Sequence, residues 1–267
     1  MNGFRWGTVH SSDLGVVLRD RSIGLIPDTR DLEVTIPGRA GVYDYRTEHD
    51  KRRLTLELLI LAPDSGALAE RLRALADLTD PTKGYQALVF DDEPEREYRV
   101  KVTGQAEVEY GHGWATVQLS LKMADPFIYA VTDTVVQADL FSGSSTQVQN
   151  DGTAPTPVVV TVEVAGVVGQ PLSPASGVGT VYTESVALLN PRVSIGGVEF
   201  AWAGQVQAGQ QLVVDTGAMT VLLDGANALG GWSGDFPLLP PGPNEVGYRD
   251  DVGGLARLTL RFRRRWT

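Results

Sequence analysis

The chain has 267 residues, of which 42% are apolar, and this length and composition suffice for two ordinary domains with proper cores. Its formal net charge of −10 argues against a dedicated nucleic-acid-binding protein, because affinity for phosphate depends on clustered Lys and Arg. The sequence has no cysteine for disulfides or thiolate metal sites, and its apolar runs fall far short of the roughly 20 residues of a membrane helix. We expect a soluble chain with no membrane span and no secretory signal in its first residues.

In chain order, the first half is predicted to contain half-buried strands and one helix. Apolar and polar residues alternate over residues 54–60 and again over residues 115–123, which is the pattern of strands that bury one face. Between them, leucines recur at helical spacing after an N-cap at Asp64 and before a stop at Pro81. This amphipathic helix of about three turns must pack its apolar stripe against a sheet.

The second half is predicted to be a β-sandwich or jelly roll. Many short alternating stretches are separated by clusters of Gly, Pro, Asn and Asp, which is typical of such folds. The boundary between the halves is expected near residues 129–133, and residues 171–180 are expected to form a loop. The predicted strands lie at residues 158–164, around Val213, at residues 221–223 and at residues 258–262.

Two clusters of opposite charge are candidates for a subunit interface. A basic step precedes the strand at residues 54–60, and an acidic loop leads into another strand, so the two could meet across a subunit interface. The alternative is that both are simply solvated. The six candidate residues are Lys51, Arg52, Arg53, Asp91, Asp92 and Glu93.

Arginines crowd the end of the chain and are expected on one side of the last strand, opposite its apolar residues. A solvated or subunit-facing surface is the favoured interpretation, because the acidic background disfavours contact with nucleic acid. The four arginines that share this face are Arg257, Arg261, Arg263 and Arg265.

Catalytic and metal-binding motifs are missing from the sequence. His10, His49 and His112 have no paired spacing, and there is no phosphate-binding loop or nucleophile elbow, so we expect no catalytic residue, no cofactor and no metal. Asp215, followed by Thr and Gly, matches the aspartic protease motif, but that chemistry needs two carboxylates that share a proton. The nearest second candidate, Asp224, lacks the following Thr or Ser. A hairpin tip accounts for Asp215 without catalysis. An aspartic protease is therefore the least favoured of the three functions considered for this chain.

The aromatic residues of the second half offer a different function. Scattered aromatics in a sandwich are more often core residues, because burying one contributes a large apolar area. Trp232 is the exception, since glycines and a serine surround it and indicate a loop. Trp232 is therefore the candidate contact for a sugar, and the alternative function is a carbohydrate-binding module for cell-wall glycans.

Four groups of residues occur in an order that is similar to that of a known family. They are PGRAGVYDY at residues 37–45, DPFIY at 125–129, NDGTAPTP at 150–157 and LLPPGPN at 238–244. In this order and spacing the chain resembles, over nearly its whole length, the distal tail proteins of long-tailed, non-contractile bacteriophages. The positions that carry the resemblance are Gly38, Gly41, Asp125, Pro126, Phe127, Asn150, Gly152, Pro155, Gly242 and Asn244.

The resemblance implies a mainly β fold of two parts. Residues 1–131 would form a ring-building β-sandwich with one packed helix, and residues 132–267 a projecting galectin-like or jelly-roll sandwich. It implies a structural virion protein, not an enzyme, that assembles in the host cytoplasm into a homo-hexameric ring at the phage tail tip. The implied partners are the tail tube protein, tail-tip hub, baseplate or fibre proteins, and DNA that passes the channel without specific binding.

Overall fold

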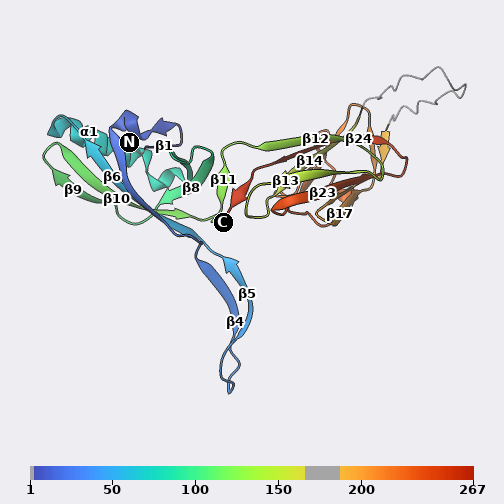
Figure 1. The fold of residues 1–267 in the computed structure, drawn as a ribbon, viewed down its shortest axis with the longest axis horizontal. Coiled ribbons are helices and arrows are strands. Elements are labelled where there is room, and N and C mark those ends of the chain that lie inside the picture. Colours follow the sequence, from blue (N-terminus) through green and yellow to red (C-terminus); the bar gives the residue numbers. More distant parts are fainter. Residues whose placement is uncertain (1–2, 166–186) are drawn as a thin grey trace, which may run out of the picture. The chain divides into compact units, whose positions relative to one another are not determined.

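A computed structural model describes residues 3–165 and 187–267, and the chain divides into two compact units (Figure 1). Unit 1 comprises Met1–Val131 with Trp266–Thr267, and unit 2 comprises Thr132–Arg265. The last two residues thus return to unit 1, where Trp266 packs against the core. As predicted, the described residues are mainly antiparallel β with one α-helix. The expected loop at residues 171–180 lies outside the described residues.

Unit 1 contains an antiparallel sheet whose strands follow the order β2-β1-β7-β8-β10-β6-β3. β8 pairs with β7 and, through Lys101 and Val102, with β10, so the two halves of the sheet share one core. β9 also pairs with β10, and β11 with β8. The strands are β1 (Phe4–Trp6), β2 (Val9–His10), β3 (Val16–Ile23), β6 (Arg52–Leu61), β7 (Gln86–Phe90), β8 (Arg96–Val102), β9 (Glu107–Gly111), β10 (Trp114–Met123), β11 (Ile128–Ala130) and β25 (Arg265–Trp266).

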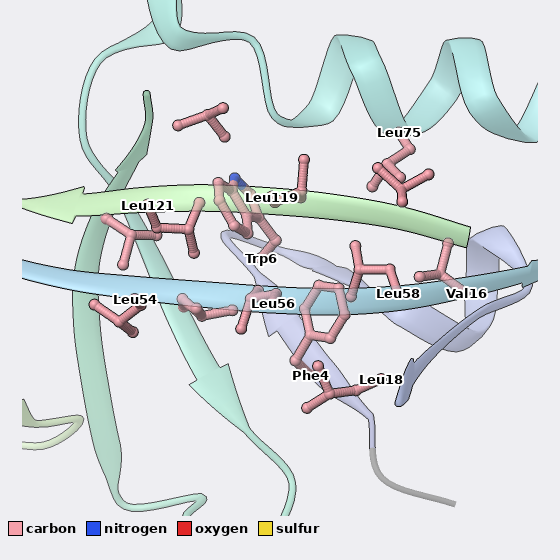
Figure 2. Packing of buried hydrophobic residues seen from close by; sticks show 14 of the residues in the cluster. Phe4, Trp6, Val16, Leu18, Leu54, Leu56, Leu58, Leu75, Leu119 and Leu121 are labelled. Atoms are coloured by element: carbon pink, nitrogen blue, oxygen red, sulfur yellow. The ribbon is translucent and has the colours of Figure 1, made fainter. Parts of the chain in front are cut away.

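The pairing of β6 with β10 is continuous from Arg52 opposite Met123 to Leu61 opposite Trp114. One face of each strand is buried, so the predicted alternation is confirmed for both. These side chains meet Phe4 and Trp6 of β1 in a single core (Figure 2). The buried apolar residues are Leu54, Leu56, Leu58 and Ile60 of β6 and Ala115, Val117, Leu119, Leu121 and Met123 of β10.

The predicted helix is α1 (Ser65–Leu78), and its stripe packs on the unit 1 core. The Asp64 carboxylate accepts a hydrogen bond from the Ala67 backbone N–H at 2.8 Å, which caps the first turn. Leu68 and Leu75 are buried, while Leu72 is partly buried. Three short 3-10 turns complete the helical elements of the described residues: η1 (Ser11–Leu14), η2 (Pro81–Lys83) and η3 (Leu229–Gly231).

Unit 2 is a sandwich of two antiparallel sheets around a second core, as predicted. One sheet has the order β12-β24-β14-β19-β20-β21 and the other β13-β23-β16-β17-β22, with a short pair β15-β18 beside them. The strands are β12 (Thr134–Phe141), β13 (Ser145–Asn150), β14 (Val158–Val164), β15 (Ala187–Leu189), β16 (Arg192–Ile195), β17 (Val198–Trp202), β18 (Gln205–Gln207), β19 (Gln211–Asp215), β20 (Thr220–Leu223), β21 (Ala226–Asn227), β22 (Trp232–Gly234), β23 (Gly242–Arg249) and β24 (Leu255–Phe262).

The two faces of β10 give a direct test of this arrangement. Leu119→Ala removes a side chain that is 2% exposed, and should lower the free energy of unfolding of unit 1 by about 2–5 kcal/mol. The neighbouring exposed Ser120, replaced by Ala, should change it by less than about 0.5 kcal/mol. Calorimetry of the full chain measures both. Equal shifts for the two variants would contradict the assigned faces.

Candidate functional site: an unpacked arm on unit 1

A two-stranded hairpin, here called the arm, leaves the sheet of unit 1 between β3 and β6. It consists of β4 (Thr29–Val34) and β5 (Tyr43–His49), which pair only with each other. Figure 1 shows the hairpin extending from the rest of unit 1. Every residue of the two strands except Glu48 is exposed. An isolated two-stranded hairpin is at best marginally stable in water, so the arm has little stability of its own.

The arm has one apolar face and one acidic face. Cross-strand partners share a face, and on the apolar face Val34 lies opposite Tyr43 and Leu32 opposite Arg46. Leu32, Val34 and Tyr43 are 45%, 47% and 41% exposed, respectively. The register shifts between Leu32 and Glu33, which leaves Tyr45 as an unpaired bulge residue.

The opposite face of the arm brings like charges together. Glu33 lies directly opposite Asp44, and Asp31 accepts a hydrogen bond from the Thr47 hydroxyl at 2.7 Å. Opposed carboxylates destabilise a strand pair. The arm therefore has uncovered apolar surface on one face, which favours association, and a repulsive pair on the other, which weakens the hairpin itself.

An ion network lies at the root of the apolar face. Arg30 Nη2 lies 2.5 Å from Glu48 Oε2, and Arg46 contacts the other oxygen of the same carboxylate. Hydrogen bonds from Arg30 and then Arg46 hold the pKa of Glu48 below its usual value. Both arginines are 68% exposed along the side chain, so they remain available to a partner.

Gly38 and Gly41 of the first motif lie at the tip of the arm. Their φ angles are 84° and 86°, a region that residues with a Cβ rarely adopt, so both glycines serve the turn. The Arg39 guanidinium carbon lies 4.2 Å from the centre of the Tyr43 ring and covers part of it.

The basic step at the base of the arm is not a surface cluster, which corrects the expectation for Arg52. Arg52 is 3% exposed, because it lies on the same side of β6 as Leu54, and burial lowers its pKa. Lys51 pairs with Asp50, and Arg53 Nε lies 3.5 Å from Asp28. Of the three basic residues, Lys51 and Arg53 remain candidates for contact with another subunit.

The acidic loop is paired within unit 1. Asp91 lies 3.0 Å from His10 Nε2, and Arg21 donates to both oxygens of Asp92 at 3.0 and 2.9 Å. Glu93 accepts a hydrogen bond from the Tyr98 hydroxyl at 2.7 Å, and burial is the first cause of the raised pKa of that hydroxyl. These partners offset part of the charge that an interface would use, so the interface role of the loop stays a prediction.

The motif at residues 125–127 closes unit 1. Asp125 accepts from the backbone N–H of Phe127 at 3.3 Å and from the Tyr129 hydroxyl at 2.5 Å, while Pro126 is buried. The Phe127 ring meets the ring of His49 edge to face, with centroids 6.2 Å apart. The motif thereby contacts the base of the arm.

The motifs of unit 2 form one buried hydrogen-bond network. Asn150 donates to the carbonyls of Leu239 and Pro240 at 3.1 and 3.2 Å, and accepts from the Gly152 N–H at 3.0 Å. Asn244 donates to Pro240 and Gly242 at 2.8 and 2.9 Å. A Cβ on Gly152 would lie 2.5 Å from the Arg265 carbonyl oxygen, so no larger residue fits. Pro155 is tied to the same region, since its carbonyl accepts from Arg265.

Trp232 is a packing residue in this structure. Its ring stacks on Phe200 at 4.9 Å and on Phe236 at 4.4 Å, and its indole N–H donates to the Gly234 carbonyl at 3.0 Å. A hollow of about 400 Å³ nearby is lined mainly by small and apolar residues, and the side-chain oxygen of its Asn227 already accepts from the Leu229 N–H. Ligand sites need several placed polar groups, so neither feature favours glycan binding.

Asp215 lies at the predicted hairpin tip between β19 and β20. Its Oδ1 accepts from the backbone N–H groups of Gly217 and Ala218, both at 2.9 Å. This turn accounts for the Asp-Thr-Gly sequence without catalysis. Within residues 3–165 and 187–267, no group of three or more His, Cys, Asp or Glu could hold a metal ion.

The C-terminal arginines differ from the expectation that four of them share one strand face. β24 ends at Phe262, so only Arg257 and Arg261 lie on it. Arg257 forms a two-pronged pair with Asp139, which lowers the pKa of that carboxyl, and Arg261 and Arg263 lie near Asp133. These pairs lie within unit 2 and fit a solvated surface.

Comparison with known proteins places the arm in a recognised domain. Residues 10–123 match the family described as phage tail protein RIFT-related domain, and no curated protein matches at a significant level. The chain also matches the crystal structure of the Dit protein (gp 19.1) of phage SPP1, with 15% identity, a TM-score of 0.74 and full coverage of both chains. The chain thus contains a segment that matches a phage tail domain, and its fold is that of the SPP1 Dit protein.

Two further matches are to the baseplate of phage P2 in its activated conformation, with Ca and with Sr. They have identities of 8% and 7%, TM-scores of 0.42 and 0.44, and cover 99% of this chain and 98% of theirs; these scores are too low to support a shared fold. In the described part of the chain, no helix is long and apolar enough to cross a membrane.

The network around Asn150 makes a prediction for unit 2. Asn150→Ala leaves three carbonyls and one N–H without this partner, so the free energy of unfolding of unit 2 should fall by about 1–3 kcal/mol. Gln149→Ala, an exposed change in the same strand, is the control and should have little effect. Calorimetry measures both, and an unchanged unfolding temperature for Asn150→Ala would contradict a structural role for the motif.

Proposed function

We propose that this chain forms a closed ring, six-fold by its resemblance, at the distal end of the tail tube. The ring would join the tube protein to hub, baseplate or fibre proteins of the tail tip and let DNA pass. The observation that carries the proposal is the arm: an ordered hairpin with one apolar face that its own subunit does not cover. It lies within the segment that matches the phage tail domain.

The two different surfaces of the subunit allow a ring. If the arm of each subunit binds a different surface of the next subunit, and not reciprocally as in a two-fold dimer, the contact is head to tail. Such contacts close into a ring when the rotation per subunit divides a full turn. The Dit protein of SPP1, described as a paradigm of hub adsorption apparatus, has the same fold over its whole chain.

The charge of the chain suits a DNA channel. A net charge of −10 and an arm face that carries Asp31, Glu33 and Asp44 disfavour binding to phosphate. DNA would therefore pass without being held. Lys51 and Arg53 on one side, and the acidic loop on the other, remain proposed secondary contacts between subunits, each worth little by itself because it is exposed and screened.

Removing the arm tests the proposal. Thr29 and His49 lie opposite each other, so residues 30–48 can be replaced by an Asn-Gly turn, which suits a hairpin of this register. The full-length parent should have six times the subunit mass in native mass spectrometry, with six-fold class averages, and the shortened chain should be a folded monomer. A parent that stays monomeric at every concentration would contradict the ring. A shortened chain that still forms the ring would contradict the role of the arm.

A further inference from the structure

The outer face of the unit 1 sheet carries a second exposed apolar surface. On β3, β6 and β10 the residues that point away from the core include Val17, Leu59, Leu61 and Trp114. Leu61 and Trp114 are paired directly and are 48% and 40% exposed. We call these four residues the outer patch.

Trp114 lies flat across the neighbouring strand. It pairs with Gly111 of β9, and a Cβ at that glycine would overlap the indole ring. The φ of Gly111 does not lie in the left-handed region, so no turn requires a glycine here. The missing side chain instead leaves room for the indole ring of Trp114. The result is a broad aromatic surface of the kind that is enriched at protein interfaces.

Acidic residues border the outer patch. Glu107 and Glu109 of β9 share the outward face with Thr116 and Gln118 of β10, and both are exposed. In the described part of the chain neither has an ion-pair partner. By contrast, Arg30 and Arg46 flank Leu32 on the apolar face of the arm. The two surfaces are thus apolar at the centre and opposite in charge at the edge.

We infer that the apolar face of the arm of one subunit packs on the outer patch of the next subunit, with Arg30 and Arg46 toward Glu107 and Glu109. This rests on the proposed ring and names its contact. Leu32, Val34 and Tyr43 would cover Leu59, Leu61 and Trp114. Leu32, Val34 and Tyr43 of the arm and Leu61 and Trp114 of the outer patch are exposed in the single subunit, while Val17 and Leu59 are half-buried. Each copy offers one of each, which is what a head-to-tail ring requires.

Cysteine crosslinking tests the contact, because the natural chain has no cysteine. The variant Val34→Cys/Thr116→Cys changes one residue on the apolar face of the arm and one in the row between Leu59 and Glu109. Both replacements are close in size to the original. Treated with a short bismaleimide crosslinker, the full chain should give a ladder of covalent oligomers up to the size of the ring.

The matched control is Glu33→Cys/Thr116→Cys, which moves the arm cysteine to the acidic face. It should give no ladder above that of the single-cysteine variants. A ring-forming parent with no ladder from Val34→Cys/Thr116→Cys, or with equal ladders from both variants, would overturn this contact and leave the ring standing. A monomeric parent would overturn the ring and this contact together.

A second measurement uses association strength. Trp114→Ser should raise the protein concentration at which half the subunits are assembled by at least tenfold, with unit 1 still folded by circular dichroism. Tyr110→Ser is the control, because Tyr110 is 70% exposed in the same hairpin but lies opposite Ala115 on the other face. An unchanged midpoint for Trp114→Ser, or equal shifts for both, would overturn the assignment.

Discussion

The structure of unit 1 depends on the strict alternation of β6. Its inner residues lie opposite those of β10 and line one side of the core. Its outer residues point away from this core, so the core does not bury them. The same strand therefore supplies Leu56 and Leu58 to folding and Leu59 and Leu61 to the surface. The arm enters β6 at its start, so the element that stabilises the subunit also positions the surfaces proposed for assembly.

The alternation of β6 also buries the charged side chain of Arg52, which is unfavourable. Its Nε and Nη2 atoms are buried without a hydrogen-bond partner, although an unpaired buried cation is unfavourable. The Tyr98 hydroxyl, which offsets part of the lowering of the Arg52 pKa, donates to Glu93. Replacing Arg52 would thus act on the folding of unit 1 more than on an interface, unlike replacement of the exposed Arg53.

Much of the fold could be predicted because its signals are local. The helical spacing and N-cap of residues 64–80 and the alternation of residues 115–123 determine those elements directly. The burial of Arg52 was missed, although its even spacing from Leu54 carried the signal, because three consecutive basic residues suggest a surface. The return of Trp266 to unit 1 and the stacking of Trp232 between phenylalanines depend on long-range packing, which no local pattern reports. For the same reason the arm could not be foreseen: residues 29–49 look like an ordinary hairpin, and only the fold shows that nothing covers it.

The central claim is that a neighbouring subunit covers the arm. Amide hydrogen exchange of the full chain, measured at concentrations that span its assembly, tests this most directly. The backbone amides of β4 and β5 should be poorly protected in the dilute subunit and become at least tenfold more protected in the assembled state, while those of β24 stay unchanged. Arm amides that are equally protected in both states would contradict the claim, as would arm amides that stay unprotected in an assembled ring.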